Sequence, residues 1–509
     1  MRTTFAALAY IVTSPIVTLL HRVGLCGSLF ALPGFERLRW KLGELGAWLR
    51  FQEAWRTVPA YRAFIARRVG STAGGLLAIE HVPVTDKASY VNAWPLEARC
   101  VRGALPASGV VIDESSGTGG APTSWVRGAR ERDANARAIR RGLQHRLGRR
   151  PIFVINAFAL GPWATGINLT LSLSRWCRVK SLGPDIAKIG NTLRDFGQGH
   201  HFVIMGYPPF LKQLVDTLEI DWVQYRVSMI YGGEGMSESM RRYLMNRGIE
   251  RVYGSYGASD LDLNIAAETE LTIALRRLLA DRPELAARLV HHRGSMPMIF
   301  QFNPADFFIE TNADGELLVT VCRPDYVAPK VRYNIHDLGH VVRFPELAKV
   351  LAEVGIPVAS LDRSALDLPL LFLYGRADAA VSYYGCKIPP ADVQEALYRV
   401  HAIAGEVDGF QLATFDDAEG DKRLVLHLEV TEALAGADAG PWTGPVFDAL
   451  AAVNQDFRES RRMVPAGKQP SLVLHARGEG PFAGMDPRVK RRYIAPAVGA
   501  PEPELTAAS

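Results

Sequence analysis

A loop rich in glycine and hydroxyl side chains, between Asp113 and Gly128, is the part of the sequence whose residue types most clearly suggest chemistry. It reads DESSGTGGAPTSWVRG and follows the apolar run VVI, which has the character of a strand end. Backbone N–H groups and hydroxyls gathered after a strand can wrap phosphate oxygens, although an ordinary glycine- and serine-rich turn would look similar. The loop is not a Walker loop, because no Gly-Lys-Ser/Thr follows. It is not a dinucleotide fingerprint either, because Pro122 occupies the third glycine position.

This loop resembles the phosphate loop Ser-Ser-Gly-Thr-Thr-Gly-Lys-Pro of the acyl-CoA synthetase and adenylation-domain superfamily, the adenylate-forming enzymes. Two positions depart from that motif: Gly119 replaces a threonine, and Ala121 replaces the lysine that would contact the leaving pyrophosphate. The resemblance implies four phosphate-binding residues, which are Ser115, Ser116, Gly117 and Thr118.

A second motif follows in the order in which the superfamily has it. Residues 232–234 read Gly-Gly-Glu and are similar to the Gly-x-Glu turn beside the adenine. The resemblance therefore implies that Gly233 and Glu234 bind the nucleotide. A strand-end turn without a ligand is the alternative for this motif and for the next one.

The third motif, residues 256–260, reads Tyr-Gly-Ala-Ser-Asp and resembles Tyr-Gly-x-Thr-Glu. By this resemblance Tyr256 stacks on adenine, Ser259 contacts the α-phosphate, and Asp260 holds Mg²⁺ as a catalytic residue. These residue types suit the roles, since a hard cation prefers carboxylate oxygen and a flat base prefers an aromatic face.

Asp337 is the strongest single candidate in the chain. The stretch VRYNIHDLG, residues 331–339, resembles Tyr-x-Thr-Gly-Asp-Leu, whose aspartate accepts both ribose hydroxyls. His336 occupies the glycine position of that motif and is given no role. A surface aspartate in a loop is the alternative for Asp337.

Three later motifs complete the series. Residues 374–378 resemble the Gly-Arg-x-Asp hinge, which implies a catalytic Arg376 on the ribose or phosphates and Asp378 as the pivot between two domains. Residues 385–389 resemble Gly-x-Arg/Asn-Ile-x-Pro, which implies a nucleotide contact by Lys387. The segment GMDPRVKRRYI offers Lys490 as the C-terminal catalytic lysine, with a basic surface helix as the alternative.

The segment FALGPWATG, residues 158–166, resembles the strip that lines the acyl pocket in the phenylacetate-CoA ligase branch of the superfamily. Phe158, Trp163 and Gly166 are the predicted pocket residues, and the two aromatic side chains could equally be ordinary core residues. The segments VPAYRAFI and HVPVTDKASYVNAWP also resemble N-terminal signatures of this branch. The resemblance extends from about Trp55 to Tyr493.

The elements that must position these residues follow from the apolar pattern. Helical spacing from Phe35 to Arg67 predicts one or two helices. Beyond Pro151, short apolar runs alternate with helical segments, which predicts a layered α/β architecture with a largely parallel sheet. Hairpin-like strands follow Asp306, with a turn at Asp314-Gly315.

We therefore predict a large multi-layered α/β domain followed by a small, mobile α+β C-terminal domain. The predicted boundaries are an apolar extension over 1–34, an adenylation domain over 35–376, a small domain over 377–494 and a disordered tail over 495–509. The tail is rich in Ala, Pro and Glu and has little to bury.

Composition narrows the class of protein. The chain has 58 Lys and Arg against 53 Asp and Glu, and the excess is dispersed, so a nucleic-acid partner is not expected. Five separated cysteines without Cys-x-x-Cys argue against a disulfide framework and a structural zinc site, and favour the cytoplasm. Residues 3–20 are uncharged and strongly apolar, and they begin the segment 3–33. They could pack against the body, lie on a membrane surface as a peripheral contact or, less favourably, span a membrane or direct export.

The leading functional hypothesis is an ATP-dependent acid–thiol ligase that uses Mg²⁺ and coenzyme A. It would activate a small carboxylic acid as an acyl-AMP, release pyrophosphate and pass the acyl group to the thiol. One alternative is a stand-alone adenylating enzyme that loads a carrier protein or forms an amide. A further alternative, motivated by Ala121, His336 and the lack of a clear Gly-Lys pair at Lys490, is a degenerate nucleotide-binding protein.

Overall fold

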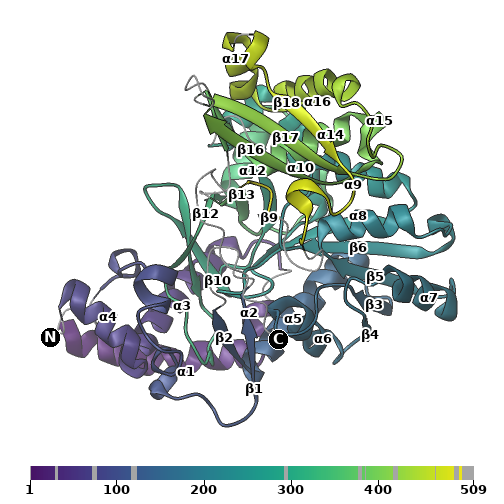
Figure 1. The fold of residues 1–509 in the computed structure, drawn as a ribbon. Coiled ribbons are helices and arrows are strands. Elements are labelled where there is room, and N and C mark those ends of the chain that lie inside the picture. Colours follow the sequence, from purple (N-terminus) through teal and green to yellow (C-terminus); the bar gives the residue numbers. More distant parts are fainter. Residues whose placement is uncertain are drawn as a thin grey trace.

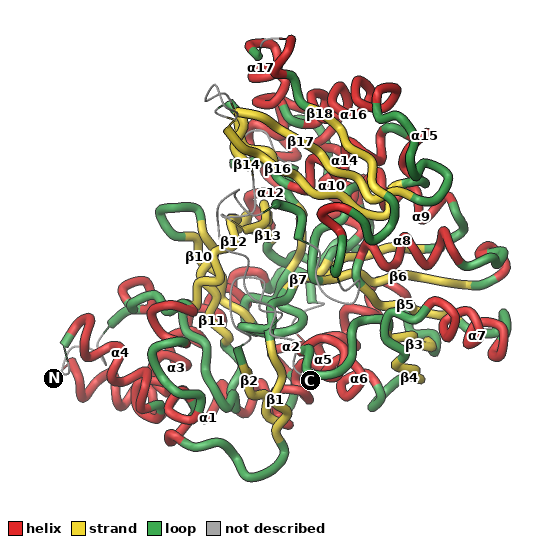
Figure 2. The backbone as a smooth tube through the Cα atoms, viewed as in Figure 1, coloured by secondary structure: helices red, strands yellow, loops and turns green. Residues whose placement is uncertain are grey.

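The fold is seen in a computed structural model that describes residues 2–28, 32–70, 77–115, 123–291, 296–376, 381–384, 386–416, 422–464, 466–485 and 492–495. Helices and strands alternate through most of this part of the chain (Figures 1 and 2). The α/β fold class is therefore confirmed. The predicted phosphate-loop residues Ser116, Gly117 and Thr118 lie outside the described residues, as do Asp378, Lys490 and nearly all of the predicted tail.

A large sheet is the centre of the molecule, and one half of it is parallel. Within the described residues eleven strands form this sheet, in the order β10-β11-β12-β13-β9-β8-β7-β6-β5-β3-β4. The parallel strands are β3 (Ile152–Asn156), β4 (Arg178–Ser181), β5 (His201–Gly206), β6 (Arg226–Gly232) and β7 (Arg251–Tyr256). Their apolar runs predicted all of them except β4, whose sequence is mostly polar.

Helices cover both faces of the parallel half, and the alternation of side chains along the strands explains why. Val154 points toward α5 and α6, whereas Phe153 and Ile155 point toward the opposite helix layer. The result is a three-layer arrangement with a hydrophobic core on each face. The covering helices are α5 (Ala129–Leu147), α6 (Ala164–Leu173), α7 (Ile186–Phe196), α8 (Pro208–Thr217) and α9 (Glu238–Asn246).

The other half of the sheet is antiparallel. The hairpin predicted at Asp314-Gly315 joins β10 to β11, and Gly315 has a φ of 80° that suits a tight turn. The antiparallel strands are β8 (Ala266–Ala267), β9 (Met298–Gln301), β10 (Phe307–Thr311), β11 (Glu316–Val321), β12 (Tyr333–Val342) and β13 (Leu370–Arg376). Their accompanying helices are α10 (Glu270–Asp281), α11 (Pro283–Leu289), α12 (Phe344–Glu353) and α13 (Val358–Leu361).

A separate hairpin carries the predicted phosphate loop. It consists of β1 (Val110–Glu114) and β2 (Ser124–Gly128), which pair antiparallel from Val110 opposite Gly128 to Glu114 opposite Ser124. The two predicted N-terminal helices are α3 (Glu36–Thr57) and α4 (Pro59–Val69), which meet at Val58. Pro59 is the first residue of α4, where its missing N–H costs no helical hydrogen bond.

The C-terminal elements form a compact α+β unit with its own hydrophobic cluster, which includes Leu397, Leu426 and Phe447. Its strands are β14 (Val381–Tyr383), β15 (Cys386–Ile388), β16 (Val407–Asp416), β17 (Lys422–Val430) and β18 (Ser471–His475). Its helices are α14 (Pro390–Arg399), α15 (His401–Ala404), α16 (Gly440–Val453) and α17 (Gln455–Met463). The helix predicted around residues 447–457 is two helices, because the Asn454 side chain caps α17.

The C-terminal unit lies against α8 and α9 of the larger unit (Figure 1). Ser239 Oγ on α9 donates to Glu395 Oε1 on α14 over 2.8 Å. The rings of Tyr243 and Tyr398 meet edge to face at 5.9 Å. The contact is therefore mostly polar and aromatic, as is typical of units that move relative to one another. The predicted domain boundaries and the mobility of the small domain stay predictions.

The N-terminal segment forms α1 (Arg2–Arg22) and α2 (Leu25–Ser28), and one face of it packs on the body. Val17 and Cys26 are buried, and Arg22 Nη2 lies 2.6 Å from Asp325 Oδ1. The opposite face is apolar and exposed, with side chains that include Val12, Ile16, Leu19 and Val23. No helix within the described residues combines the length and apolar character needed to cross a membrane.

Candidate functional site

Four of the predicted nucleotide-binding residues lie where β6 and β7 end: Gly233, Glu234, Tyr256 and Ser259. Gly233 and Glu234 follow β6 directly, and the Tyr256 motif follows from the last residue of β7. Because β6 and β7 are parallel neighbours, these two segments lie side by side. Ligands of open α/β sheets bind at this edge.

Asp337 meets Tyr256 across the site. The Tyr256 hydroxyl donates a 2.8 Å hydrogen bond to Asp337 Oδ2, and both residues are at least nine-tenths buried. Burial raises the pKa of Tyr256 well above its usual value, and the Asp337 carboxylate raises it further, so the phenol stays protonated as a donor. Pairing of β12 with β13 places Asp337 opposite Arg376, whose side chain is exposed at the end of β13.

The ring of Tyr256 also packs against the ring of Phe300, with centroids 5.9 Å apart and an angle of 30°. Tyr256, which is predicted to stack on adenine, thus contacts an aromatic ring and a carboxylate within the protein. Its position is set by the fold, because the hydroxyl and the ring are both engaged. The stacking role itself stays a prediction.

Asp260 is held in the same manner by a second tyrosine. Tyr333, at the start of β12, donates from its hydroxyl to Asp260 Oδ2 over 2.9 Å. The Lys330 ammonium lies 4.0 Å from the centre of the Trp125 ring and 5.5 Å from that of Tyr333. Burial lowers the pKa of Lys330 to about 7, while Asp260 acts in the opposite direction.

Glu234 links the two units of the chain. Tyr207 Oη donates to Glu234 Oε2 over 2.7 Å, and Tyr493 Oη, from the last described segment, donates to Oε1 over 2.6 Å. Gly233 has a φ of 89°, and a Cβ there would lie 3.3 Å from the Tyr207 ring, so the turn needs glycine. Sequence reasoning missed Tyr493, since a lone tyrosine in a C-terminal segment carries no motif.

A buried ion pair between β1 and β2 holds the hairpin that carries the predicted phosphate loop. Ser115, the described end of the loop, exchanges hydrogen bonds with Thr123 across the open end of the hairpin. Behind it, Arg127 Nε donates to Asp113 Oδ2 over 2.7 Å, and the same guanidinium donates to the carbonyl of Ser259. The base of the loop and the Tyr256 motif are therefore held as one body. Sequence reasoning missed this pair.

A largely apolar cavity opens beside these residues. Gly232, Gly233 and Ser259 line one end of it, and Phe158 and Arg146 are also part of its wall. The Phe158 ring lies over Gly232, because a Cβ on that glycine would meet its Cζ at 3.6 Å. The predicted pocket residue Phe158 thus borders a cavity next to the motifs that are predicted to bind the nucleotide.

The other two predicted pocket residues are placed beside that cavity rather than in its lining. Trp163 precedes α6 and forms a β-bridge with Glu114. Gly166 lies inside α6, where a Cβ would come within 2.2 Å of the carbonyl oxygen of Ala159. Close approach of α6 to the chain after β3 therefore accounts for this glycine, while Thr165 and Leu169 of the same helix reach the cavity.

His336, which departs from the superfamily motif, and the predicted nucleotide contact Lys387 are both found in strands of the described structure. His336 has a φ of 64°, in the region that favours glycine, and its Nδ1 lies 3.0 Å from Glu316 Oε1. The histidine at the motif's glycine position thus adopts a backbone conformation that favours glycine. Lys387 lies in β15 opposite Ser382, and its side chain lies outside the described part of the structure.

Among the described residues, no three His, Cys, Asp or Glu side chains converge as a metal-binding group. Asp260 is a single carboxylate with one neutral hydrogen-bond donor, which fits a Mg²⁺ ion that takes its remaining ligands from phosphate oxygens and water. A dedicated protein cage is not needed for that use of Mg²⁺.

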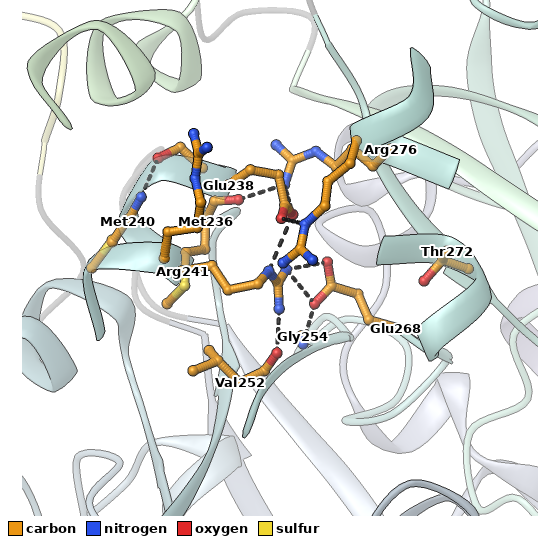
Figure 3. A network of polar contacts seen from close by, with 12 residues as sticks. Met236, Glu238, Met240, Arg241, Val252, Gly254, Glu268, Thr272 and Arg276 are labelled. Atoms are coloured by element: carbon orange, nitrogen blue, oxygen red, sulfur yellow. Dashed lines mark hydrogen bonds and ion pairs between the residues drawn. The ribbon is translucent and has the colours of Figure 1, made fainter. Parts of the chain in front are cut away.

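Directly behind the site lies an ionic cluster that sequence reasoning did not identify (Figure 3). Arg241 Nη2 lies 2.7 and 2.8 Å from the two carboxylate oxygens of Glu268, and Gly254 of β7 donates its N–H to Glu268 over 2.6 Å. Arg241 and Arg276 also both donate to Glu238 Oε1. The cluster ties α9, α10 and β7 together.

Comparisons with known proteins bear on the fold. No family model and no curated protein matches the sequence. A crystal structure of 2-hydroxyisobutyryl-CoA ligase in the postadenylation state, in complex with 2-HIB-AMP, is similar with a TM-score of 0.64 and 16% identity, over 91% of this chain and 90% of that chain. The same ligase with 2-HIB-AMP and CoA in the thioesterification state gives a TM-score of 0.51 over the same shares, again at 16% identity.

These similarities extend over nearly the whole chain and include both units. The phenylacetate-CoA ligase branch stays a prediction. The chain has the fold of the adenylate-forming enzymes, the superfamily that its motifs resemble.

Proposed function

We propose that this protein is an ATP-dependent, AMP-forming acid–thiol ligase. It activates a small carboxylic acid as an acyl-AMP and transfers the acyl group to a thiol, with coenzyme A as the leading acceptor. One observation carries the proposal: Asp337 and Asp260, each hydrogen-bonded by a buried tyrosine, flank the Ser259 turn that borders a largely apolar cavity.

The roles of the polar residues follow from their charges. Asp337 would accept the ribose hydroxyls, and Gly233 and Glu234 would border the adenine. Ser115 and Ser259 would approach the phosphates, together with Ser116, Gly117 and Thr118. A bound Mg²⁺ would neutralise phosphate charge, and Asp260 is the carboxylate available to orient it.

The acid would lie in the cavity bordered by Phe158, with its carboxylate toward Ser259. A carboxylate is a poor electrophile, so alignment against the α-phosphate and exclusion of water are the main tasks of this wall. Arg376 is exposed at the end of β13 opposite Asp337, a position from which it would reach the ribose or the phosphates.

The transfer step would use the C-terminal unit. Its contact with the larger unit is polar, and the arrangement is more similar to the postadenylation state of the neighbouring ligase than to the thioesterification state, with TM-scores of 0.64 and 0.51. We therefore propose that the described arrangement belongs to the first half-reaction. Rotation about Asp378 would then replace Lys490 with the surface that admits the thiol.

Acid-dependent exchange between pyrophosphate and ATP tests the first half-reaction, with aryl, short aliphatic and amino acids as substrates. The expected result is exchange with a subset of acids, which Asp337→Asn slows by on the order of 10²-fold. AMP release that requires CoA, rather than a carrier protein or an amine, then separates the ligase from the alternative adenylating enzymes. Normal MgATP binding without exchange for any acid would instead favour a degenerate nucleotide-binding protein.

The membrane-surface contact through residues 3–33 stays a prediction, and the exposed face of α1 makes it testable. Val12, Ile16 and Leu19 recur at helical spacing and are each more than half exposed, at 54%, 55% and 59%. Replacing all three with serine should reduce co-sedimentation with phosphatidylglycerol vesicles. Equal sedimentation of both proteins would contradict the contact.

A further inference from the structure

The cavity beside Ser259 runs along β7 to a buried arginine. Arg146 lies in the last turn of α5, and its carbonyl oxygen accepts a 2.9 Å hydrogen bond from Arg251, the first residue of β7. Its guanidinium lies 5.5 Å from the centre of the Tyr253 ring, in the middle of that strand. Ser259 follows the end of β7, so the cavity has a nucleotide-proximal end at Ser259 and a distal end at Arg146.

The guanidinium at the distal end lacks a full set of partners. Arg146 is 7% exposed, and its Nε donates to the carbonyl of Gly142 over 3.0 Å. Its Nη1 is buried without a hydrogen-bond partner among the described residues. Burial lowers the pKa of Arg146 to about 10, so the side chain remains a cation at neutral pH. A buried cation with an open donor is costly unless an anion completes it.

No described carboxylate neutralises this cation by direct contact. Glu268 is close enough to favour the charged form of Arg146, but it is paired with Arg241 in two contacts and also accepts from Gly254 and Tyr231. The charge of Glu268 is therefore already balanced within the cluster of Figure 3.

A purely structural role explains only part of Arg146. A cation in the last turn of a helix and a guanidinium near an aromatic ring are both stabilising. Together with the hydrogen bond from Nε to Gly142, these effects explain the position of the guanidinium near Tyr253. They do not provide a hydrogen-bond acceptor for Nη1 among the described residues. Arg146 also borders a second cavity on the other side of α5, where the polar side chains Gln301 and Asp306 already have partners of their own.

We propose that the acid activated by this enzyme carries a second carboxylate, which Arg146 binds at the distal end of the pocket. The inference rests on the proposed function and specifies its substrate class. The apolar wall between the two ends, which includes Leu169, Met205 and Ile230, would hold the carbon skeleton. A charge-assisted pair in a buried pocket rejects the analogue that lacks the charged group much more strongly than an apolar pocket rejects a missing methylene.

The test compares acids in pairs that share a skeleton, such as pentanoate with glutarate and phenylacetate with 4-carboxyphenylacetate. Pyrophosphate exchange gives kcat/KM for each acid, and calorimetry gives the affinity of the enzyme for each acid without ATP. Wild type is expected to prefer at least one diacid over its partner by on the order of 10²-fold. Arg146→Met should lose most of that preference, because kcat/KM and affinity should fall for the diacid and not for its partner. Arg146→Lys should restore part of the preference.

Arg137→Met is the matched control, because Arg137 is an exposed arginine on the same helix and should leave every ratio unchanged. Thermal unfolding of each variant establishes that it is folded. The inference is overturned if wild type shows no diacid preference, or if a folded Arg146→Met retains it. Exchange with none of the acids, together with diacid binding that depends on Arg146, would refute the proposed function while supporting the site.

Discussion

Two groups of carboxylates lie close together in this molecule, and the fold compensates their charges in different ways. Asp337, Asp260 and Glu234, at the edge of the sheet, accept hydrogen bonds from tyrosine hydroxyls. Glu268 and Glu238, behind the sheet edge, are paired with arginines. A tyrosine hydroxyl is a neutral donor, so it orients a carboxylate and leaves its charge in place. An arginine orients the carboxylate and also neutralises its charge.

The carboxylates that are paired with arginines hold the scaffold. Although burial raises the pKa of Glu238, Arg241, Arg276 and Arg277 together lower it to about 2. Its charge is therefore balanced within the protein. At the sheet edge, Asp260 accepts from the neutral phenol of Tyr333, whose pKa is raised by burial and by Asp260, so the phenol stays protonated as the donor. The ionic cluster keeps α9, α10 and β7 in place behind that edge.

The largest expected effect is on the scaffold cluster. Arg241→Met leaves Glu268 buried without its arginine partner, so the free energy of unfolding should fall by about 3–5 kcal/mol. Urea denaturation measures the loss. Arg277→Met is the control, because Arg277 contacts Glu238 from a side chain that is 46% exposed and should cost less than about 1 kcal/mol. Equal losses in the two variants would contradict a special role for the buried pair.

The next largest effect is catalytic. Asp337→Asn keeps an acceptor for the Tyr256 hydroxyl but removes the charge, so unfolding should change by less than about 1 kcal/mol. The rate of pyrophosphate exchange should fall by on the order of 10²-fold, because a neutral amide is a weaker acceptor for two ribose hydroxyls. Asp281→Asn, at the exposed end of α10, is the control. Near-normal exchange with a lower stability would reclassify Asp337 as a scaffold residue.

Asp260→Asn tests the second carboxylate of the site. The amide preserves the contact with Tyr333 but lacks the charge that Mg²⁺ prefers, so the Mg²⁺ concentration for half-maximal exchange should rise by about tenfold. Nucleotide affinity should change by less than about threefold, on the same reasoning. An unchanged Mg²⁺ dependence would remove Asp260 from the metal site.

Lys330, the cation beside Asp260, gives a pH-dependent test. Burial lowers its pKa to about 7, so the folded protein holds the lysine proton less tightly than the unfolded chain, whose value is 10.5. The destabilisation that comes from burying the Lys330 ammonium is complete below about pH 7 and disappears as the pH rises toward 10.5. The free energy of unfolding should therefore rise across this window. Lys330→Met should therefore stabilise the protein by about 1–3 kcal/mol at pH 6 and by less at pH 9.5.

Urea denaturation at the two pH values measures that difference. Lys349→Met, an exposed lysine on α12, is the control and should show no such trend. A constant offset between wild type and Lys330→Met at both pH values would show that the ammonium is compensated by the Trp125 and Tyr333 rings.

The same comparison shows which features could be predicted from sequence. Apolar runs predicted β3, β5, β6 and β7, because buried parallel strands are apolar on both faces. Motif order predicted that Tyr256, Asp260 and Asp337 belong to one site, and the structure brings them together with Tyr333. Residues that a ligand requires recur in recognisable types and spacing, and this makes them visible in a sequence.

Residues that compensate charge inside the protein carry no such spacing. Arg127 and Asp113 are 14 positions apart, and Arg241 and Glu268 are 27 apart, so only the fold shows that each arginine has a carboxylate partner. Arg146 was missed for a related reason, since it is one of many arginines on α5 and its burial is decided by the tertiary packing.

The smallest expected effect concerns Glu234, where the two units share one carboxylate. Tyr493→Phe removes the 2.6 Å hydrogen bond to Glu234 Oε1 but keeps the ring packed against Phe410, with centroids 4.7 Å apart. A single such bond contributes about 0.5–1.5 kcal/mol, so docking of the C-terminal unit should weaken by no more than about tenfold while the fold is unaffected. Small-angle scattering and limited proteolysis of the free enzyme measure the docked population. Tyr207→Phe is the matched control, because it removes a donor to Glu234 from within the larger unit and should leave docking unchanged. If Tyr207→Phe loosens the C-terminal unit as much as Tyr493→Phe does, Glu234 acts by holding its own turn rather than by joining the two units.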